Sequence, residues 1–179
     1  PASARALVIG GTGPTGPAIV SGLEHRGLTV TLFHTGRHEV DEVAHVEHLH
    51  GDPFSAEGVT EALSDRTFDV VVACYGRLRA IAEVLSGRCE RFVSVGGTPA
   101  YRGYFDPTRF DPPGLPIPTA EDAPRSTQDD DGKSYRVART EDLLFEHQPA
   151  AIHLRYPFVY GPRQIAPLDW CIVRRVLDR

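Results

Sequence analysis

Short apolar runs and amphipathic stretches alternate along most of the chain. The apolar runs are rich in β-branched residues and predict buried strands, and the stretches between them, with apolar residues three and four positions apart, predict helices. The predicted strands are 5–10, 28–33, 45–52, 68–76, 91–97 and 150–156, and the predicted helices are 17–27, 55–65, 77–87 and 134–148.

This alternation predicts an α/β fold. Parallel neighbouring strands need crossover connections, so we expect a Rossmann-like doubly wound parallel sheet with helices on both faces. A chain of 179 residues with 41 % hydrophobic residues is long enough for one domain with a core and too short for two of ordinary size. We therefore expect a single domain over residues 1–179.

The proline-rich stretch 99–133 is the exception to the alternation of strands and helices. It predicts a long irregular loop, which favours a functional role.

Charge and cysteine content limit the binding partners and the cellular compartment that we expect. A net charge of −5 gives no basic field for a nucleic acid or an anionic membrane, so neither is expected as a partner. No apolar run approaches the ~20 residues that span a bilayer. Cys74, Cys89 and Cys171 are an odd number without metal-ligand spacing and are predicted to be buried thiols in a reducing compartment, which favours the cytoplasm.

The stretch LVIGGTGPTGPAIV, residues 7–20, joins a predicted strand to a predicted helix through a glycine cluster. Gly10, Gly13 and Gly16 follow the spacing G-x-x-G-x-x-G in the context typical of a dinucleotide-binding loop. Pro14 and Pro17 have no N–H group to donate. We therefore expect the N–H groups of Gly13, Thr15 and Gly16 to bind the pyrophosphate, at the positive end of the helix dipole.

The end of the second predicted strand indicates the choice of cofactor. Folds that prefer NAD usually place an acidic residue there for the ribose hydroxyls, whereas this chain has His34, followed by Arg37. A 2′-phosphate would meet hydrogen-bond donors there. NADP is favoured over NAD on this ground, although Arg37 could instead be a solvated loop charge.

Four segments together resemble the extended short-chain dehydrogenase/reductases, the NAD(P)-dependent epimerase/dehydratase family. They are GGTGPTG at 10–16, HGDPF at 50–54, SYRVAR at 134–139 and LRYPFVYGP at 154–162. The resemblance implies that Asp52 reads the adenine amino group with Pro53 or Phe54 against the ring, although Asp52 could instead be a turn residue. It also implies that the segment after the last strand lines the nicotinamide: Tyr156, Pro157 and Phe158. Members of the family carry a C-terminal substrate domain, which is expected to be absent or truncated in this chain.

The resemblance further implies a catalytic pair of a Ser/Thr hydroxyl and a Tyr-x-x-x-Lys helix. Tyr135 matches the tyrosine, but Arg139 stands where lysine is expected, so its support of a lowered tyrosine pKa is in question. The expected hydroxyl position holds Gly97, which makes Thr98 the first candidate and Ser94 the second. Each of these hydroxyls could equally have a structural role.

Histidines recur on the third predicted strand. His48 and His50 share a face and could in principle bind a metal, but no third ligand of suitable type is evident nearby, so no metal site is expected.

Two functions follow. The first is an NAD(P)-dependent epimerase, dehydratase or reductase that acts on a hydroxyl or carbonyl of a small, sugar-type molecule, with Tyr135 as the acid/base. The alternative is a dinucleotide-binding sensor or scaffold of the same fold that has lost catalysis, which the change to Arg139 and the missing serine favour. The sequence leaves the substrate and the oligomeric state open, a homodimer among the options.

Overall fold

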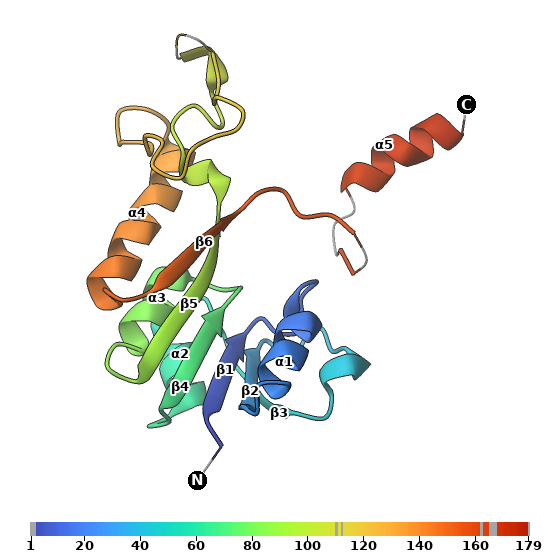
Figure 1. Cartoon of the computed structure of the whole chain (residues 1–179), viewed down its shortest axis with the longest axis vertical. Helices are drawn as coiled ribbons and strands as arrows, with labels where there is room; N and C mark the ends of the chain where they lie inside the picture. Colours follow the sequence, from blue (N-terminus) through green and yellow to red (C-terminus); the bar gives the residue numbers. More distant parts are fainter. Residues whose placement is uncertain (1–2, 110, 112, 162, 165–167, 179) are drawn as a thin grey trace.

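A computed structural model of the chain describes residues 3–109, 111, 113–161, 163–164 and 168–178. Six parallel strands form one sheet in the order β3-β2-β1-β4-β5-β6 (Figure 1). The strands are β1 (Arg5–Ile9), β2 (Thr29–His34), β3 (Glu47–His50), β4 (Phe68–Ala73), β5 (Cys89–Gly97) and β6 (Ile152–Tyr156). The strand order reverses between β1 and β4, which is where ligands bind in open sheets of this kind. The predicted fold class is confirmed.

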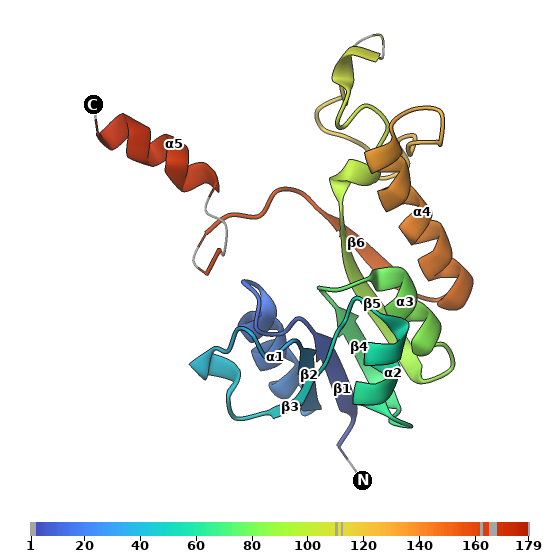
Figure 2. The same cartoon turned by 180° about the vertical axis from the view of Figure 1, so that it is seen from behind.

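Helices cover both faces of the sheet (Figures 1 and 2). They are α1 (Gly16–Glu24) on one face and α2 (Ala56–Leu63), α3 (Leu78–Val84) and α4 (Gly132–His147) on the other. β1 explains why both faces need cover, since its side chains alternate: Leu7 and Ile9 enter the core under α2, α3 and α4, whereas Val8 enters the core under α1. All three side chains are fully buried.

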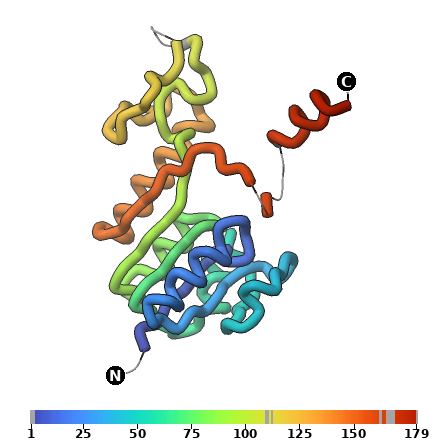
Figure 3. Tube along the Cα trace, turned by 45° about the vertical axis from the view of Figure 1, so that its right-hand side comes forward, coloured from blue at the N-terminus to red at the C-terminus, as the bar shows by residue number. Residues whose placement is uncertain are grey.

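The predicted long loop leaves the end of β5 and returns to the start of α4. Figure 3 shows it extending beyond the end of the sheet. Two short 3₁₀ segments, Thr98–Ala100 and Pro107–Arg109, are its only helical segments in the part that the structure describes. Arg125 ties the loop to α4, because its guanidinium donates to Asp142 Oδ1 at 2.7 Å and to Glu141 Oε2 at 3.2 Å.

The buried face of α4 differs from the prediction. The sequence places Ala138, Leu143, Leu144 and Phe145 inward, but Phe145 is exposed and Leu143 is only half-buried. The helix instead buries Glu141, in phase with Ala138 and Leu144 at spacings of three. The apolar pattern does not indicate this face, because the charged residue Glu141 lies on it.

A last helix, α5 (Leu168–Leu177), lies apart from the sheet in Figures 1 and 3. Cys171 on this helix is exposed, so the prediction of three buried thiols is wrong for it, since no core covers α5. Cys74 and Cys89 are partly buried, and burial raises the pKa of the Cys74 thiol to about 11. None of the helices in the described residues has the length and apolar character that a membrane span requires.

Candidate functional site

A pocket of about 270 Å³ lies where the strand order reverses. Three segments line it, each at the carboxyl end of a strand: the glycine loop after β1, the loop after β2 and the turn after β4. Its lining residues include Gly10, Gly13 and Thr15 of the first segment, His34 and Arg37 of the second, and Tyr75 of the third. The structure therefore brings together the predicted phosphate loop and the predicted ribose-binding residues.

The glycine loop is a cradle that larger residues would fill. Gly10 has a φ of +86°, in the left-handed region that favours glycine, and a Cβ there would lie 2.4 Å from Tyr75 Cβ. A Cβ on Gly16 would lie 1.9 Å from the carbonyl oxygen of Gly11, so α1 can begin this close to the loop only at glycine. A Cβ on Gly13 would lie 3.2 Å from Gly10 O, a tight but smaller overlap. This close packing of backbone on backbone fits the approach of a pyrophosphate.

The hydrogen bonds of this loop alter the predicted set of donors. The Gly13 N–H donates to Gly10 O at 3.0 Å, and the Gly16 N–H donates to Gly13 O at 3.0 Å, so two of the three predicted donors are already used in turns. The Thr15 N–H has no acceptor among the described residues. Thr15 and Thr12 both line the pocket, and the Thr12 N–H likewise has no backbone acceptor among the described residues, so these two threonines supply the donors best placed for an anion.

The end of β2 carries no carboxylate on the pocket wall. His34, Arg37 and His38 line the pocket there, and the Arg37 side chain is exposed. His34 is 3 % exposed, and burial lowers its pKa despite the nearby Glu39 carboxylate. Of the basic residues at this edge, Arg37 therefore supplies the fixed positive charge.

Asp52 lies outside the lining of this pocket, at an exposed turn after β3. Its Oδ1 accepts the Phe54 N–H at 2.8 Å, the turn geometry that the sequence left open as the alternative to adenine recognition. Pro53 is buried beneath this turn. Phe54 is 42 % exposed and its ring lies 5.1 Å from that of Tyr75, so this aromatic pair extends from the pocket wall.

A second pocket, of about 510 Å³, lies beside the ends of β5 and β6. Thr98 and Tyr156 both line it, so the predicted hydroxyl and the first residue of the predicted nicotinamide segment share one wall. Pro157 and Phe158 follow β6 and are exposed, and neither lines this pocket.

The start of α4 fixes the position of Tyr135. The Asp131 carboxylate accepts the N–H groups of Lys133 at 3.0 Å and Ser134 at 3.3 Å, which caps the helix four residues before Tyr135. Tyr135 is half-buried, and Arg139 is exposed. The 3₁₀ turn that begins at Thr98 packs against α4. The structure thus places the predicted hydroxyl and the predicted tyrosine on contacting elements.

Ser94 lies deeper than the other catalytic candidates. It is fully buried, and its Oγ is 2.8 Å from His153 Nδ1. The other nitrogen of the His153 ring lies 3.4 Å from Glu141 Oε1, and Glu141 is bound in turn by Arg155. This geometry favours a role for the Ser94 hydroxyl in joining β5 to β6.

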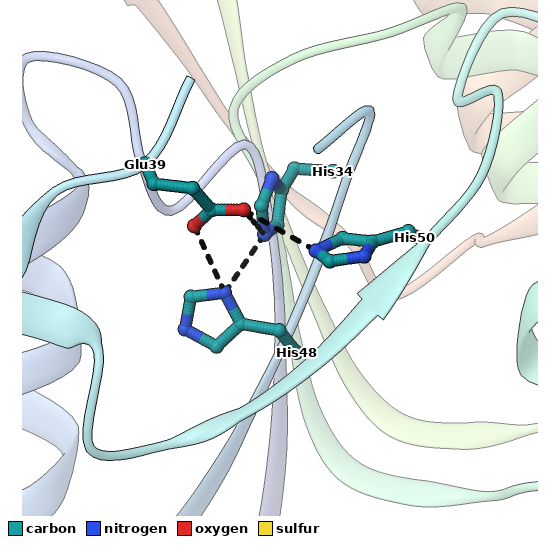
Figure 4. Close-up of side chains that lie close together, drawn as sticks. All are labelled: His34, Glu39, His48 and His50. Carbon is teal, nitrogen blue, oxygen red and sulfur yellow. Dashed lines mark hydrogen bonds and ion pairs between the residues drawn. The ribbon is translucent and has the colours of Figure 1, made fainter. Parts of the chain in front are cut away.

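Sequence reasoning missed two groups of side chains. One is the buried network of Glu141, His153 and Arg155, which the alternation of polar residues along β6 could have indicated. The other is a cluster of His34, Glu39, His48 and His50, whose ligand atoms all lie within 4.8 Å of one another (Figure 4). The expectation that no third ligand lies near His48 and His50 is wrong, because β2 and the loop after it supply His34 and Glu39.

Comparisons with solved structures match nearly the whole chain. The WbmH enzyme of Bordetella bronchiseptica in complex with NAD⁺ matches at a TM-score of 0.74 and 17 % identity, over 98 % of this chain and 62 % of that one. The UDP-glucose 4-epimerase of Thermus thermophilus with NAD matches at 0.69 and 22 % identity, over 95 % and 60 %. The dTDP-glucose 4,6-dehydratase of Bacillus anthracis with NAD matches at 0.69 and 16 % identity, over 98 % and 62 %.

No protein-family profile matches the sequence, and no curated protein does. The chain spans about 60 % of the length of the matched structures. Identities of 16–22 % together with high structural similarity establish a shared fold. The chain has the Rossmann-like fold of the NAD-bound epimerases, dehydratases and short-chain dehydrogenase/reductase proteins that it matches.

Proposed function

We propose that the chain is the dinucleotide-binding part of an NAD(P)-dependent epimerase, dehydratase or reductase of the extended short-chain dehydrogenase/reductase family. The observation that carries this proposal is the pocket at the reversal of strand order, with the glycine loop as its wall. The glycine contacts fit a pyrophosphate, and the aromatic pair of Phe54 and Tyr75 offers apolar surface for an adenine ring. The matched structures contain NAD, which supports the same class of ligand.

Within this proposal NADP is the favoured cofactor. Arg37 lines the pocket at the end of β2, and the pocket lining that the structure describes contains no Asp or Glu. Guanidinium groups bind phosphate with two parallel hydrogen bonds, so Arg37 is suited to a 2′-phosphate. NAD would have to bind without the acidic partner that usually accepts its ribose hydroxyls.

The proposed chemistry depends on Thr98, which lines the second pocket, and on two residues of α4, the helix that packs against the turn at Thr98. A bound nicotinamide supplies hydride transfer, and the protein supplies orientation and proton transfer. We assign proton exchange at a substrate oxygen to Tyr135, hydrogen bonding to Thr98, and electrostatic support of the tyrosine to Arg139. A sugar-type hydroxyl or carbonyl is the proposed substrate, because matched structures include epimerases and a dehydratase named for nucleotide sugars.

A sensor or scaffold that binds a dinucleotide without turnover is the second candidate. The specific observation in its favour is the exposed Arg139, where an ammonium group would be expected to hold both ribose and tyrosine. Turnover separates the two candidates, because both require the dinucleotide pocket. The cytoplasmic location and a homodimeric assembly stay predictions from the sequence.

Calorimetric titration of NADP(H) and NAD(H) tests the proposal. The parent chain should bind at least one of them, and Gly13→Val should abolish binding by filling the space above Gly10 O. Gly22→Val is the matched control, because a Cβ there meets only the Arg26 guanidinium, at 3.6 Å. A parent chain that binds neither cofactor, or a Gly13→Val variant that binds as the parent does, contradicts the proposal.

A further inference from the structure

Three imidazoles and a carboxylate meet at the carboxyl ends of β2 and β3. The two strands are parallel neighbours in which His34 pairs with His50 and Leu32 pairs with His48. His48 and His50 are two residues apart and share a face, and His34 lies beside them on the adjacent strand. Glu39 enters from the loop after β2. Figure 4 shows all four side chains directed towards one another.

The distances between the ligand atoms suit one small cation. His34 Nε2 lies 3.0 Å from His48 Nδ1 and 3.8 Å from Glu39 Oε1, and the other carboxylate oxygen lies 3.2 Å from His48 Nδ1. His50 Nε2 lies 3.3 Å from Glu39 Oε1. Four ligands at the zinc–nitrogen distance of about 2.0–2.1 Å in a tetrahedron lie about 3.3–3.4 Å apart, which falls inside the range of these four distances. The separations in the whole group extend to 4.8 Å, so the cluster has to close up around a bound ion.

The hydrogen bonds behind the cluster orient one ligand in advance. His48 Nε2 lies 2.9 Å from the carbonyl oxygen of Val43. A carbonyl only accepts, so this ring nitrogen carries the proton and Nδ1 presents its lone pair to the centre of the cluster. A metal-bound histidine commonly donates its other N–H to a carbonyl in this way.

A cation in this cluster would have to displace the hydrogen bond between His34 and His48. The Gly36 N–H donates to His34 Nδ1 at 3.2 Å, so Nε2 carries the ring proton and donates it to His48 Nδ1. A cation at the centre replaces this hydrogen bond. The His34 proton then moves from Nε2 to Nδ1, and the Gly36 N–H, on an exposed residue, turns to solvent.

The four side chains of the cluster differ in their exposure to solvent. The side chains of His34 and His48 are 4 % and 17 % exposed, whereas those of His50 and Glu39 are 54 % and 50 % exposed. The two more deeply placed rings are held by the sheet, and the other two ligands close from the solvent side. Imidazole-rich sites favour zinc-like transition metals over magnesium or calcium. We propose that His34, His48, His50 and Glu39 bind one divalent transition-metal ion of the zinc type.

The test uses zinc alone on the chelator-treated chain, without nucleotide, so its result does not depend on the proposed cofactor. Competition with a chromophoric chelator should give one Zn²⁺ per chain, bound fully at about 10 µM chain. Co²⁺ in its place should give the intense visible absorption of a four-coordinate ion. Zinc should also raise the melting temperature, because the ion binds the folded chain.

Matched variants locate the ion. His48→Gln and His50→Gln should each weaken zinc binding at least 10-fold, as should Glu39→Gln. His45→Gln is the control, because His45 lies on the same segment, is 56 % exposed and pairs with Glu24 outside the cluster. Glu42→Gln, whose carboxylate pairs with Arg163, is the control for Glu39→Gln. Circular dichroism confirms that each variant is folded.

The proposal requires stoichiometric binding by the parent, weaker binding by all three cluster variants and unchanged binding by both controls. Any other combination overturns it. In particular, a parent that takes up no zinc would show that the four side chains form only a hydrogen-bonded network.

Discussion

The Glu141 carboxylate and the Arg155 guanidinium form a two-point ion pair between α4 and β6. Arg155 Nε lies 2.8 Å from Oε1, and Arg155 Nη2 lies 2.8 Å from Oε2. The Glu141 side chain is only 2 % exposed. Burial acts to raise the pKa of Glu141, but the His153 ring and the Arg155 guanidinium lower it to about 2. Folding therefore favours the ionised form of Glu141 over its protonated form.

Glu141→Gln should lower the free energy of unfolding by about 3 kcal/mol at neutral pH, because it removes a paired charge and leaves the Arg155 guanidinium without its carboxylate partner. A carboxyl whose pKa is lower in the folded chain stabilises the fold fully at pH values above its pKa in the unfolded chain, about 4.3. This stabilisation is lost as the pH falls towards the pKa of the folded chain. The difference between parent and variant should therefore shrink between about pH 4.5 and pH 2. Urea unfolding across this range measures it.

The control is Glu146→Gln, which changes an exposed carboxylate on the same helix. Its effect on unfolding should be within about 0.5 kcal/mol at every pH. A Glu141→Gln difference that stays constant from pH 7 to pH 2 would contradict the assigned ion pair.

The fold could be predicted because its central strands are apolar on both faces. β1 and β4 are apolar at nearly every position, and the helices between strands are amphipathic, so alternation alone indicates a parallel sheet. Strand ends were less certain. The predicted strand 45–52 is only Glu47–His50 in the structure, because Gly51 begins the turn in which the Asp52 carboxylate accepts a backbone N–H.

The site was predictable only where one local motif carries it. The glycine loop is such a motif, and its three glycines are found against backbone or Tyr75 as expected of close packing. The histidine cluster depends instead on the register of β2 against β3 and on the path of the loop that brings Glu39 back. Neither the register nor the path of this loop can be predicted from the spacing of His48 and His50. The buried Glu141 depends likewise on Arg155, a partner on another element.

Gly16→Ala should destabilise the chain whether or not a cofactor is present. The new Cβ would lie 1.9 Å from Gly11 O and 2.2 Å from Gly11 C, and backbone atoms cannot move aside without opening the loop. Overpacking of this kind costs about 1–3 kcal/mol or more. A Cβ on Gly22 in the same helix would make only an ordinary contact with the Arg26 guanidinium, at 3.6 Å, so Gly22→Ala should be neutral or stabilising by up to about 1 kcal/mol. Equal unfolding free energies for the two variants would show that the loop is not close-packed.

Arg37→Ala should weaken NADP(H) binding by about 1.5–3 kcal/mol, the range for hydrogen bonds to charged groups, and leave NAD(H) binding nearly unchanged. The reason is that Arg37 lines the pocket at the predicted 2′-position of the ribose. Arg26→Ala is the control, because that exposed arginine donates to Gly22 O and lies outside the pocket lining. Equal losses for both cofactors would show that Arg37 does not distinguish them.

Tyr135→Phe should separate binding from turnover. The ring and its packing at the capped start of α4 are kept, so cofactor affinity should hold, whereas removal of the titratable oxygen should lower the rate by about 10²–10⁴-fold. UDP-glucose and dTDP-glucose are the first substrates to assay, after the enzymes that the structure matches. Tyr160→Phe is the control, because Tyr160 is 74 % exposed and lies outside α4. A Tyr135→Phe variant as fast as the parent would show that Tyr135 does not transfer the proton.

Arg139→Lys decides between an enzyme adapted to arginine and a sensor. Tyr135 and Arg139 are four residues apart on α4, so both lie on one helix face. A guanidinium and an ammonium differ in shape and hydration, so in an enzyme the exchange should change the turnover rate, with the melting temperature unchanged. Arg136→Lys, which changes an exposed arginine that donates to Gly132 O on the same helix, should leave the rate as it is. If parent and Arg139→Lys both bind a dinucleotide but show no turnover with any substrate assayed, the sensor is favoured, because the lysine of the family's pattern has then been restored without effect.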